Sequence, residues 1–119
     1  MASDLADMPI QPYGPDKRPL TRAEMSALQQ QVPQWTIVES GDVPWLERRF
    51  RFADFAQALA FTQAVGALAE AINHHPLLIT EWGAVTVRWW THAVKGLHIN
   101  DFIAAAKTDR LFAGHAAGP

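Results

Sequence analysis

The stretch from Phe55 to about Asn73 limits most strongly how this chain can fold. It contains no proline, and Asp54 is placed to cap a helix, with Gln57 at the third helical position. Two rows of small or apolar residues follow helical spacing: Ala58, Phe61, Val65, Leu68 and Ile72, and beside them Phe55, Leu59, Thr62, Gly66 and Ala69. One sheet face covers only one row. The second row therefore requires either another subunit or the other helices of this chain.

Four segments rich in β-branched and aromatic residues flank this helix. They span residues 35–39, 45–52, 77–82 and 84–92, and form two pairs across Gly-containing turns. In the last segment, alternation places Thr86, Arg88, Trp90 and His92 on one face. These patterns predict two antiparallel strand pairs.

Two further helices complete the pattern. Thr21 and Glu24 form a capping box for a helix that Pro33 stops, and Asn100 or Asp101 begins a helix that ends near Gly114. The order αββαββα predicts an α+β two-layer sandwich, with a four-stranded antiparallel sheet and three helices on one face. We predict a flexible Pro-rich lead over residues 1–19, a single domain over 20–114 and a flexible tail over 115–119.

Composition excludes several classes of function. The net charge of −2 provides no electrostatic footprint for nucleic acid or a membrane surface. The absence of cysteine excludes disulfides and thiolate chemistry. We find no signal-peptide pattern and no run near the roughly 18 apolar residues of a membrane span. The sequence thus predicts a cytoplasmic protein without a membrane or direct nucleic-acid partner.

The sequence EAINHHPLLITEWG, residues 70–83, places two of the five histidines side by side. On a helix, Glu70 and His74 share one face, so the carboxylate can orient the imidazole for acid/base work. In the alternative interpretation, His75 and Pro76 simply end the helix. A metal site built from Glu70, His74, His75 and His92 is a third interpretation, but the helical His-Glu-x-x-His arrangement is absent. His98 and His115 are predicted to be surface residues.

The wider spacing resembles the signature of the pterin-4a-carbinolamine dehydratases. The spacing runs Glu70, three residues, His74-His75-Pro76, five residues, Trp82, nine residues, His92, eight residues, Asp101. The segments PQWTI, FADFAQALAFTQAVGALAEA and WWTHAVKGLHINDFIAAAKTD also resemble that family, so the likeness covers roughly residues 20–110. Many members carry an acidic residue and Trp after His-His-Pro, where this chain has Leu77 and Leu78.

The resemblance implies a metal-independent hydro-lyase. Family members dehydrate 4a-hydroxytetrahydropterin, left by aromatic amino acid hydroxylases, to quinonoid dihydropterin, and the pterin is substrate rather than cofactor. By resemblance, His74, His75 and His92 are the catalytic set. Glu70, Pro76, Trp82, Trp90 and Asp101 are the supporting or substrate-binding residues; the two tryptophans are equally consistent with sheet core or interface. Eliminating water needs an acid and a base, and imidazoles can serve as either.

A binding protein is the alternative of a different class. The family also includes a dimerisation cofactor for a homeodomain transcription factor, and the apolar helix over 55–73 suits helix association. We expect that helix to serve self-assembly into a dimer of dimers, as in family tetramers. A catalytically silent relative is disfavoured, since such a relative is expected to lose one of the three histidines.

Overall fold

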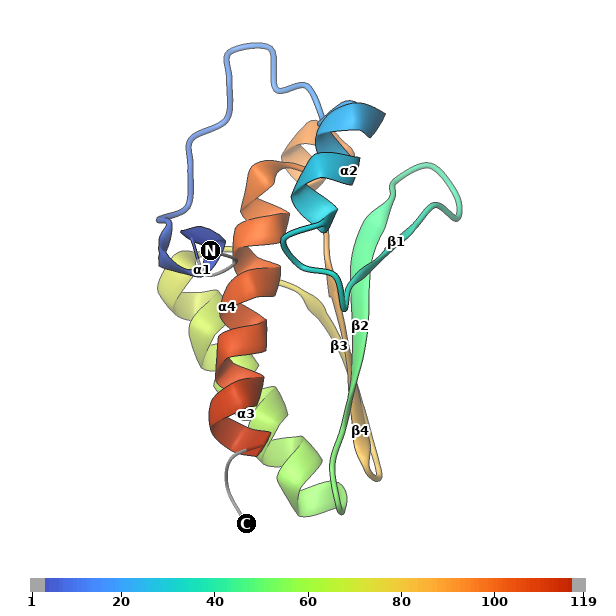
Figure 1. The fold of residues 1–119 in the computed structure, drawn as a ribbon, viewed down its shortest axis with the longest axis vertical. Helices are drawn as coiled ribbons and strands as arrows, with labels where there is room; N and C mark the ends of the chain where they lie inside the picture. The colour runs from blue at the N-terminus through green and yellow to red at the C-terminus, as the bar shows by residue number, and fades with distance from the viewer. Residues whose placement is uncertain (1–3, 117–119) are drawn as a thin grey trace.

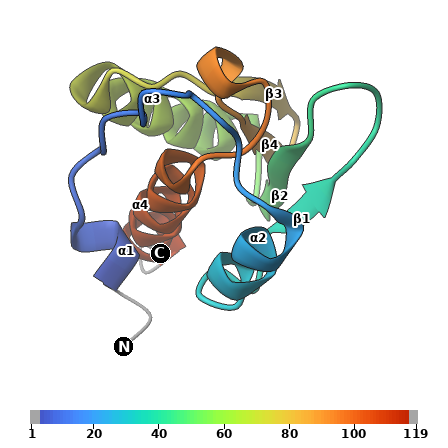
Figure 2. The ribbon, with the colours of Figure 1, turned by 90° about the horizontal axis from the view of Figure 1, so that it is seen from above.

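The protein consists of one layer of helices packed on one face of a four-stranded antiparallel sheet (Figure 1). The structure is a computed structural model and describes residues 4–116. The strands are β1 (Thr36–Val38), β2 (Trp45–Arg51), β3 (Leu77–Glu81) and β4 (Ala84–Trp89), in the order β1-β2-β4-β3. The larger helices are α2 (Arg22–Gln29), α3 (Phe55–Ile72) and α4 (Ile99–Ala116), which lie on one side of the sheet in Figure 2. The predicted α+β sandwich is confirmed.

Local signals position the ends of these elements. Asp54 accepts a hydrogen bond from the Gln57 backbone N–H at 2.9 Å, so α3 begins where the cap predicts. The capping box between Thr21 and Glu24 is present at α2. Gly83 turns β3 into β4 with a φ of 79°, a conformation that L-residues with side chains rarely adopt. The structure adds two short helices to the predicted order, α1 (Asp4–Asp7) and η1 (His92–Val94).

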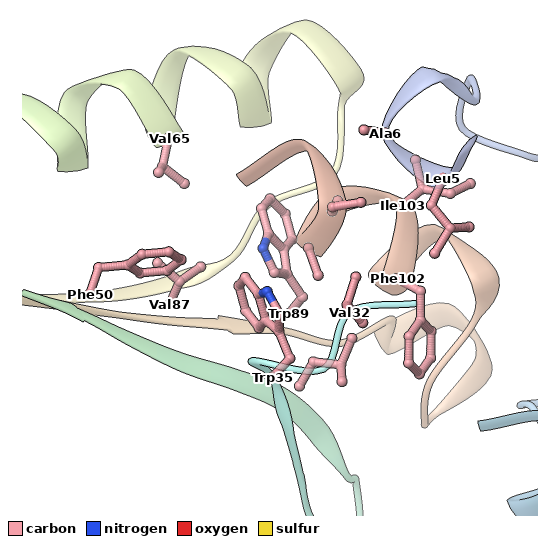
Figure 3. Close-up of a cluster of buried hydrophobic side chains, with 14 of the residues drawn as sticks. Leu5, Ala6, Val32, Trp35, Phe50, Val65, Val87, Trp89, Phe102 and Ile103 are labelled. Atoms are coloured by element: carbon pink, nitrogen blue, oxygen red, sulfur yellow. The ribbon is translucent and has the colours of Figure 1, made fainter. Parts of the chain in front are cut away.

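The core lies between the inner sheet face and α3 and α4. Phe50 and Val87 from the sheet meet Val65 of α3, beside the indoles of Trp35 and Trp89 (Figure 3). Each buried indole has an acceptor on α4: Trp35 Nε1 donates to Asp109 at 2.8 Å and Trp89 Nε1 donates to Thr108 at 3.2 Å. These bonds remove the cost of burying a polar N–H, so the tryptophans fix α4 relative to the sheet.

Part of α3 remains uncovered by the described chain. Ala58, Phe61, Val65 and Ala69 are buried, whereas Phe55 and Leu59 of the second row are 45% and 41% exposed. By length and composition alone, α3 is long and apolar enough to cross a membrane: its mean hydropathy is 1.3, and 22% of its residues are buried in the described structure. Its buried residues form one stripe against the sheet, and the exposed Phe55 and Leu59 make a second part of its surface apolar as well. The helices of this chain therefore do not complete its burial within residues 4–116.

The N-terminal segment differs from the predicted flexible lead. Within residues 4–19 the chain packs against α4, with Leu5 and Ala6 of α1 buried beside Ile103 (Figure 3). Lys107 Nζ donates to the Ala6 carbonyl at 2.9 Å. Proline density rules out a long helix here, but it does not prevent irregular backbone from packing when apolar side chains and side-chain donors meet it. At the other end, α4 continues beyond Gly114 to Ala116, and residues 117–119 of the predicted tail lie outside the described residues.

Candidate active site

The His-His-Pro motif lies in the short loop between α3 and β3 rather than on the helix. The helix ends at Ile72, and Asn73 takes the left-handed conformation with φ 53° and ψ 44°. Asparagine is among the few residues with a side chain that often adopt this conformation. Pro76 precludes further helix, and β3 starts at the next residue. The two histidines therefore do not follow helical spacing.

This loop conformation changes the partner of Glu70. The predicted pairing of Glu70 with His74 is wrong, because His74 lies beyond the helix end where the four-residue rule no longer applies. Instead the Glu70 Oε2 lies 2.5 Å from His75 Nε2. Both side chains are exposed, so water weakens this contact.

His74 is held by a buried carboxylate from α4. Its Nε2 lies 2.7 Å from Asp101 Oδ1, and the side chains are 10% and 0% exposed. The imidazole also stacks on the Trp89 indole with 5.4 Å between ring centroids and 20° between planes. A carboxylate on one nitrogen and an aromatic face beneath the ring leave His74 with one defined orientation.

The other hydrogen bonds of Asp101 define which nitrogen of His74 carries the proton. Asp101 Oδ2 accepts from Thr91 Oγ1 at 2.7 Å and from the His98 backbone N–H at 2.9 Å. The carboxylate thus acts as an acceptor throughout, and we assign Nε2–H of His74 as the donor to Oδ1. In the neutral ring, Nδ1 then carries the free lone pair and can accept a proton.

His92 comes from the end of the neighbouring strand. The prediction that it continues β4 is wrong: regular pairing ends at Trp89, Thr91 forms an isolated bridge to Gly96, and His92 begins η1. The buried Thr91 hydroxyl is committed to Asp101, whereas the His92 side chain is exposed. This turn away from the sheet brings His92 to the same hollow as the His74–His75 pair.

A cavity of about 390 Å³ gathers the three histidines. Its lining residues are Tyr13, Asn73, His74, His75, Trp90, Thr91, His92 and Ala93. Of the predicted supporting residues, Trp90 lines the cavity, and Asp101 and Glu70 contact lining histidines from outside it. Pro76 adjoins His75 without lining the cavity, and Trp82 is 72% exposed at the turn between β3 and β4. Nothing in the described part of this chain brings Trp82 into the site.

Metal ligation would need three side chains aimed at one point. Within residues 4–116, no three His, Asp or Glu side chains form such a group. The described carboxylates near the motif instead each engage one imidazole, Asp101 with His74 and Glu70 with His75. Each of these two imidazoles thus has one nitrogen next to a carboxylate oxygen, which orients the ring.

Sequence reasoning missed Tyr13, Asn73 and His98. His98 is half-buried rather than a surface residue: its Nδ1 accepts from the Asn100 backbone N–H at 3.2 Å and its ring meets Tyr13 edge-to-face. Burial lowers the pKa of His98, the Asp101 charge opposes this shift, and His74 reinforces it. Asn73 was detectable, since asparagine at a helix end beside His-His-Pro is typical of a left-handed cap. No sequence pattern around Tyr13 indicates that it lies in the site.

Comparisons with known proteins point to one family. The model of the Pterin 4 alpha carbinolamine dehydratase family matches residues 18–111. A Microcystis aeruginosa protein that carries the pterin-4-alpha-carbinolamine dehydratase name is 50% identical over 110 residues, covering 92% of this chain and 95% of the relative. A Gloeobacter violaceus protein of the same name is 56% identical over 99 residues, covering 83% and 85%.

Two solved structures resemble the fold. A transcriptional coactivator/pterin dehydratase from Brucella melitensis superposes with a TM-score of 0.72 at 28% identity, covering 79% of this chain and 98% of that one. A pterin dehydratase-like protein described as a RuBisCO assembly factor of the alpha-carboxysome gives a TM-score of 0.56 at 26% identity, covering 66% and 88%. The same fold thus occurs in proteins with catalytic and with assembly descriptions.

Proposed function

This chain belongs to the pterin-4a-carbinolamine dehydratase family, and we propose that it dehydrates 4a-hydroxytetrahydropterin to quinonoid dihydropterin. The observation that carries the proposal is the convergence of His74, His75 and His92 on one cavity. They lie on two different connections, the loop after α3 and the turn after β4. Such convergence of titratable groups in a pocket is typical of an active site.

The proposed reaction consists of two proton transfers around one bond cleavage. The C4a–O bond breaks as an acid protonates the departing hydroxyl, and a base removes a proton from a ring nitrogen, so that water and the quinonoid product form. An imidazole has an ordinary pKa near 6.5, so histidines can perform both transfers near neutral pH. In our proposal the protein supplies both groups itself and needs neither metal nor organic cofactor.

The contacts of His74 support a role as the base. Its Nε2–H is committed to Asp101, so the lone pair on Nδ1 is the one free for proton transfer. His75 and His92 are more exposed and can release or take up protons from water, which suits the acid. Trp90 supplies an aromatic wall beside them.

The test is turnover of enzymatically generated 4a-hydroxytetrahydropterin, followed by ultraviolet absorbance. We expect the protein to accelerate the spontaneous reaction with a chelator present, and His74→Ala and His92→Ala to lower kcat by about 10²–10⁴-fold. Trp82→Ala is the matched control, because this exposed residue lies outside the cavity. No acceleration by the folded protein would reject the proposal. Activity lost to the chelator would reject its metal-free form.

The biological setting follows from the substrate. Aromatic amino acid hydroxylases release 4a-hydroxytetrahydropterin, so we propose that the protein recycles the pterin cofactor of such an enzyme. Co-turnover tests this role: adding the protein to a pterin-dependent phenylalanine hydroxylase with a dihydropteridine reductase should raise the sustained rate when spontaneous dehydration is limiting. An unchanged rate under those conditions would contradict it.

A second candidate function is protein binding through α3. Phe55 and Leu59 expose an apolar row that the described chain leaves uncovered. We propose that this row mediates self-assembly into a dimer of dimers, because burying such a surface is favourable and the chain's other copies always supply a matching one. Light scattering should then give a mass near four chains. A monomer at micromolar concentration would reject self-assembly and favour a foreign partner.

A further inference from the structure

The segment between α1 and α2, residues 8–21, forms a strap that runs up one edge of the molecule in Figure 1 and passes over the end of the helix layer in Figure 2. Asn100, which is 1% exposed, holds the strap near its start: the Gln11 backbone N–H donates to Asn100 Oδ1 at 2.7 Å, and Asn100 Nδ2 donates to the Gln11 carbonyl at 2.9 Å. Such a pair of hydrogen bonds from a buried amide fixes both position and direction of the strap backbone.

The far end of the strap is also anchored. The Leu20 backbone N–H donates to the Leu97 carbonyl at 2.8 Å. Beside it, Pro19 passes so close to Gly96 that a Cβ at position 96 would lie 2.8 Å from the Pro19 Cβ, so glycine is required there. Two fixed points therefore bracket Tyr13, which lies between Gln11 and Pro19.

Tyr13 is the strap residue that reaches the cavity. It lines the wall together with the histidines and Trp90. Its ring meets that of His98 edge-to-face, with centroids 5.0 Å apart and planes at 87°. Tyr13 is nevertheless 39% exposed, so an aromatic surface and a hydroxyl are held in place but incompletely covered. An aromatic ring that is fixed in position, partly exposed and next to a polar cavity suits a flat heterocyclic ligand.

We propose that Tyr13 contacts the bound pterin and sets its affinity, so that the strap forms part of the substrate site. This inference rests on the proposed function. The family match begins at residue 18, so it assigns no role to Tyr13. In this proposal Tyr13 binds the substrate, and the proton transfers stay with the histidines, of which His74 is paired with Asp101.

The test separates KM from kcat in Tyr13→Ala, Tyr13→Phe and a strap control, Asp16→Asn, whose exposed side chain lies outside this cavity. Losing an aromatic contact should raise KM about threefold to tenfold. We expect kcat to stay within about twofold, because uniform binding is removed without changing the reacting groups. Tyr13→Phe keeps the ring and should retain most of the affinity, and Asp16→Asn should match the parent protein.

A binding measurement distinguishes failure of this inference from failure of the proposed function. Calorimetric titration with 7,8-dihydrobiopterin, which carries no 4a-hydroxyl and cannot lose water, should show the same weakening in Tyr13→Ala. Unchanged KM and Kd in an active Tyr13→Ala would overturn the inference alone. A lower kcat with unchanged KM would also overturn it, since Tyr13 would then act through His98. A parent protein that neither turns over nor binds pterin would overturn the proposed function, and the inference with it.

Discussion

Replacing Asp101 by asparagine should reverse the tautomer of His74. The position of Oδ2 accepts from Thr91 Oγ1 and the His98 backbone N–H, so the amide oxygen of the introduced side chain must occupy it. The amide NH₂ then faces His74 Nε2, where two donors would meet. To keep a hydrogen bond, His74 must accept at Nε2 and carry its proton on Nδ1. The nitrogen that we assign as base would then have no lone pair.

The size of the effect follows from these contacts. Loss of a positioned general base should lower kcat by about 10²–10⁴-fold. The carboxylate of Asp101 accepts three hydrogen bonds, from His74, Thr91 and the His98 backbone N–H. In the variant a neutral amide replaces this carboxylate in all three, and each replacement costs about 1 kcal/mol. We therefore expect the free energy of unfolding to fall by about 3 kcal/mol at most, because a neutral amide is also cheaper to bury than a carboxylate. The variant should remain folded enough to measure.

Three readouts decide this prediction: kcat by stopped-flow absorbance, the free energy of unfolding in urea, and the His74 tautomer by ¹⁵N NMR. Asp109→Asn is the control, a carboxylate on the same helix whose partners are Trp35 and Arg48, outside the cavity. It should lose stability without losing kcat. A folded Asp101→Asn with the kcat of the parent protein, or with His74 still protonated at Nε2, would refute the reasoning.

Three further predictions concern the remaining contacts. Glu70→Gln should lower kcat by less than about tenfold, because the exposed pair with His75 is screened by water; a loss as large as that of Asp101→Asn in the same assay would contradict this. Because burial lowers the pKa of His98 in the folded protein, the unfolded chain binds a proton at this residue at a higher pH than the folded protein does. The contribution of neutral His98 to the free energy of unfolding is therefore complete above about pH 6.5 and declines as the pH falls. Urea unfolding at several pH values should therefore show that the free energy of unfolding falls less steeply with acid in His98→Asn than in the parent protein. An identical fall in both proteins would show that His98 does not have a lowered pKa. Leu59→Glu should reduce the mass seen by light scattering without loss of helical circular dichroism, and an unchanged mass would place the assembly interface elsewhere.

The elements of the fold were predictable because their signals are local. The caps at Asp54 and Thr21 act within three residues, Gly83 acts within one turn, and strand alternation acts along each segment. Such interactions depend on neighbours in the chain, which the sequence displays directly. The three histidines were likewise identified from their spacing within a family pattern, and the structure gathers them at one cavity.

The partners within the site depended on tertiary structure. One left-handed residue, Asn73, moves His74 off the helix, so Glu70 meets His75 and the buried Asp101, 27 residues away, meets His74. Tyr13 lines the cavity on a strap that Asn100 and Leu97, both distant in the sequence, hold at Gln11 and Leu20. Helical or strand spacing specifies which way a side chain points from its own element. Which distant group completes its hydrogen bonds is decided by how the elements pack, and that depends on the whole core.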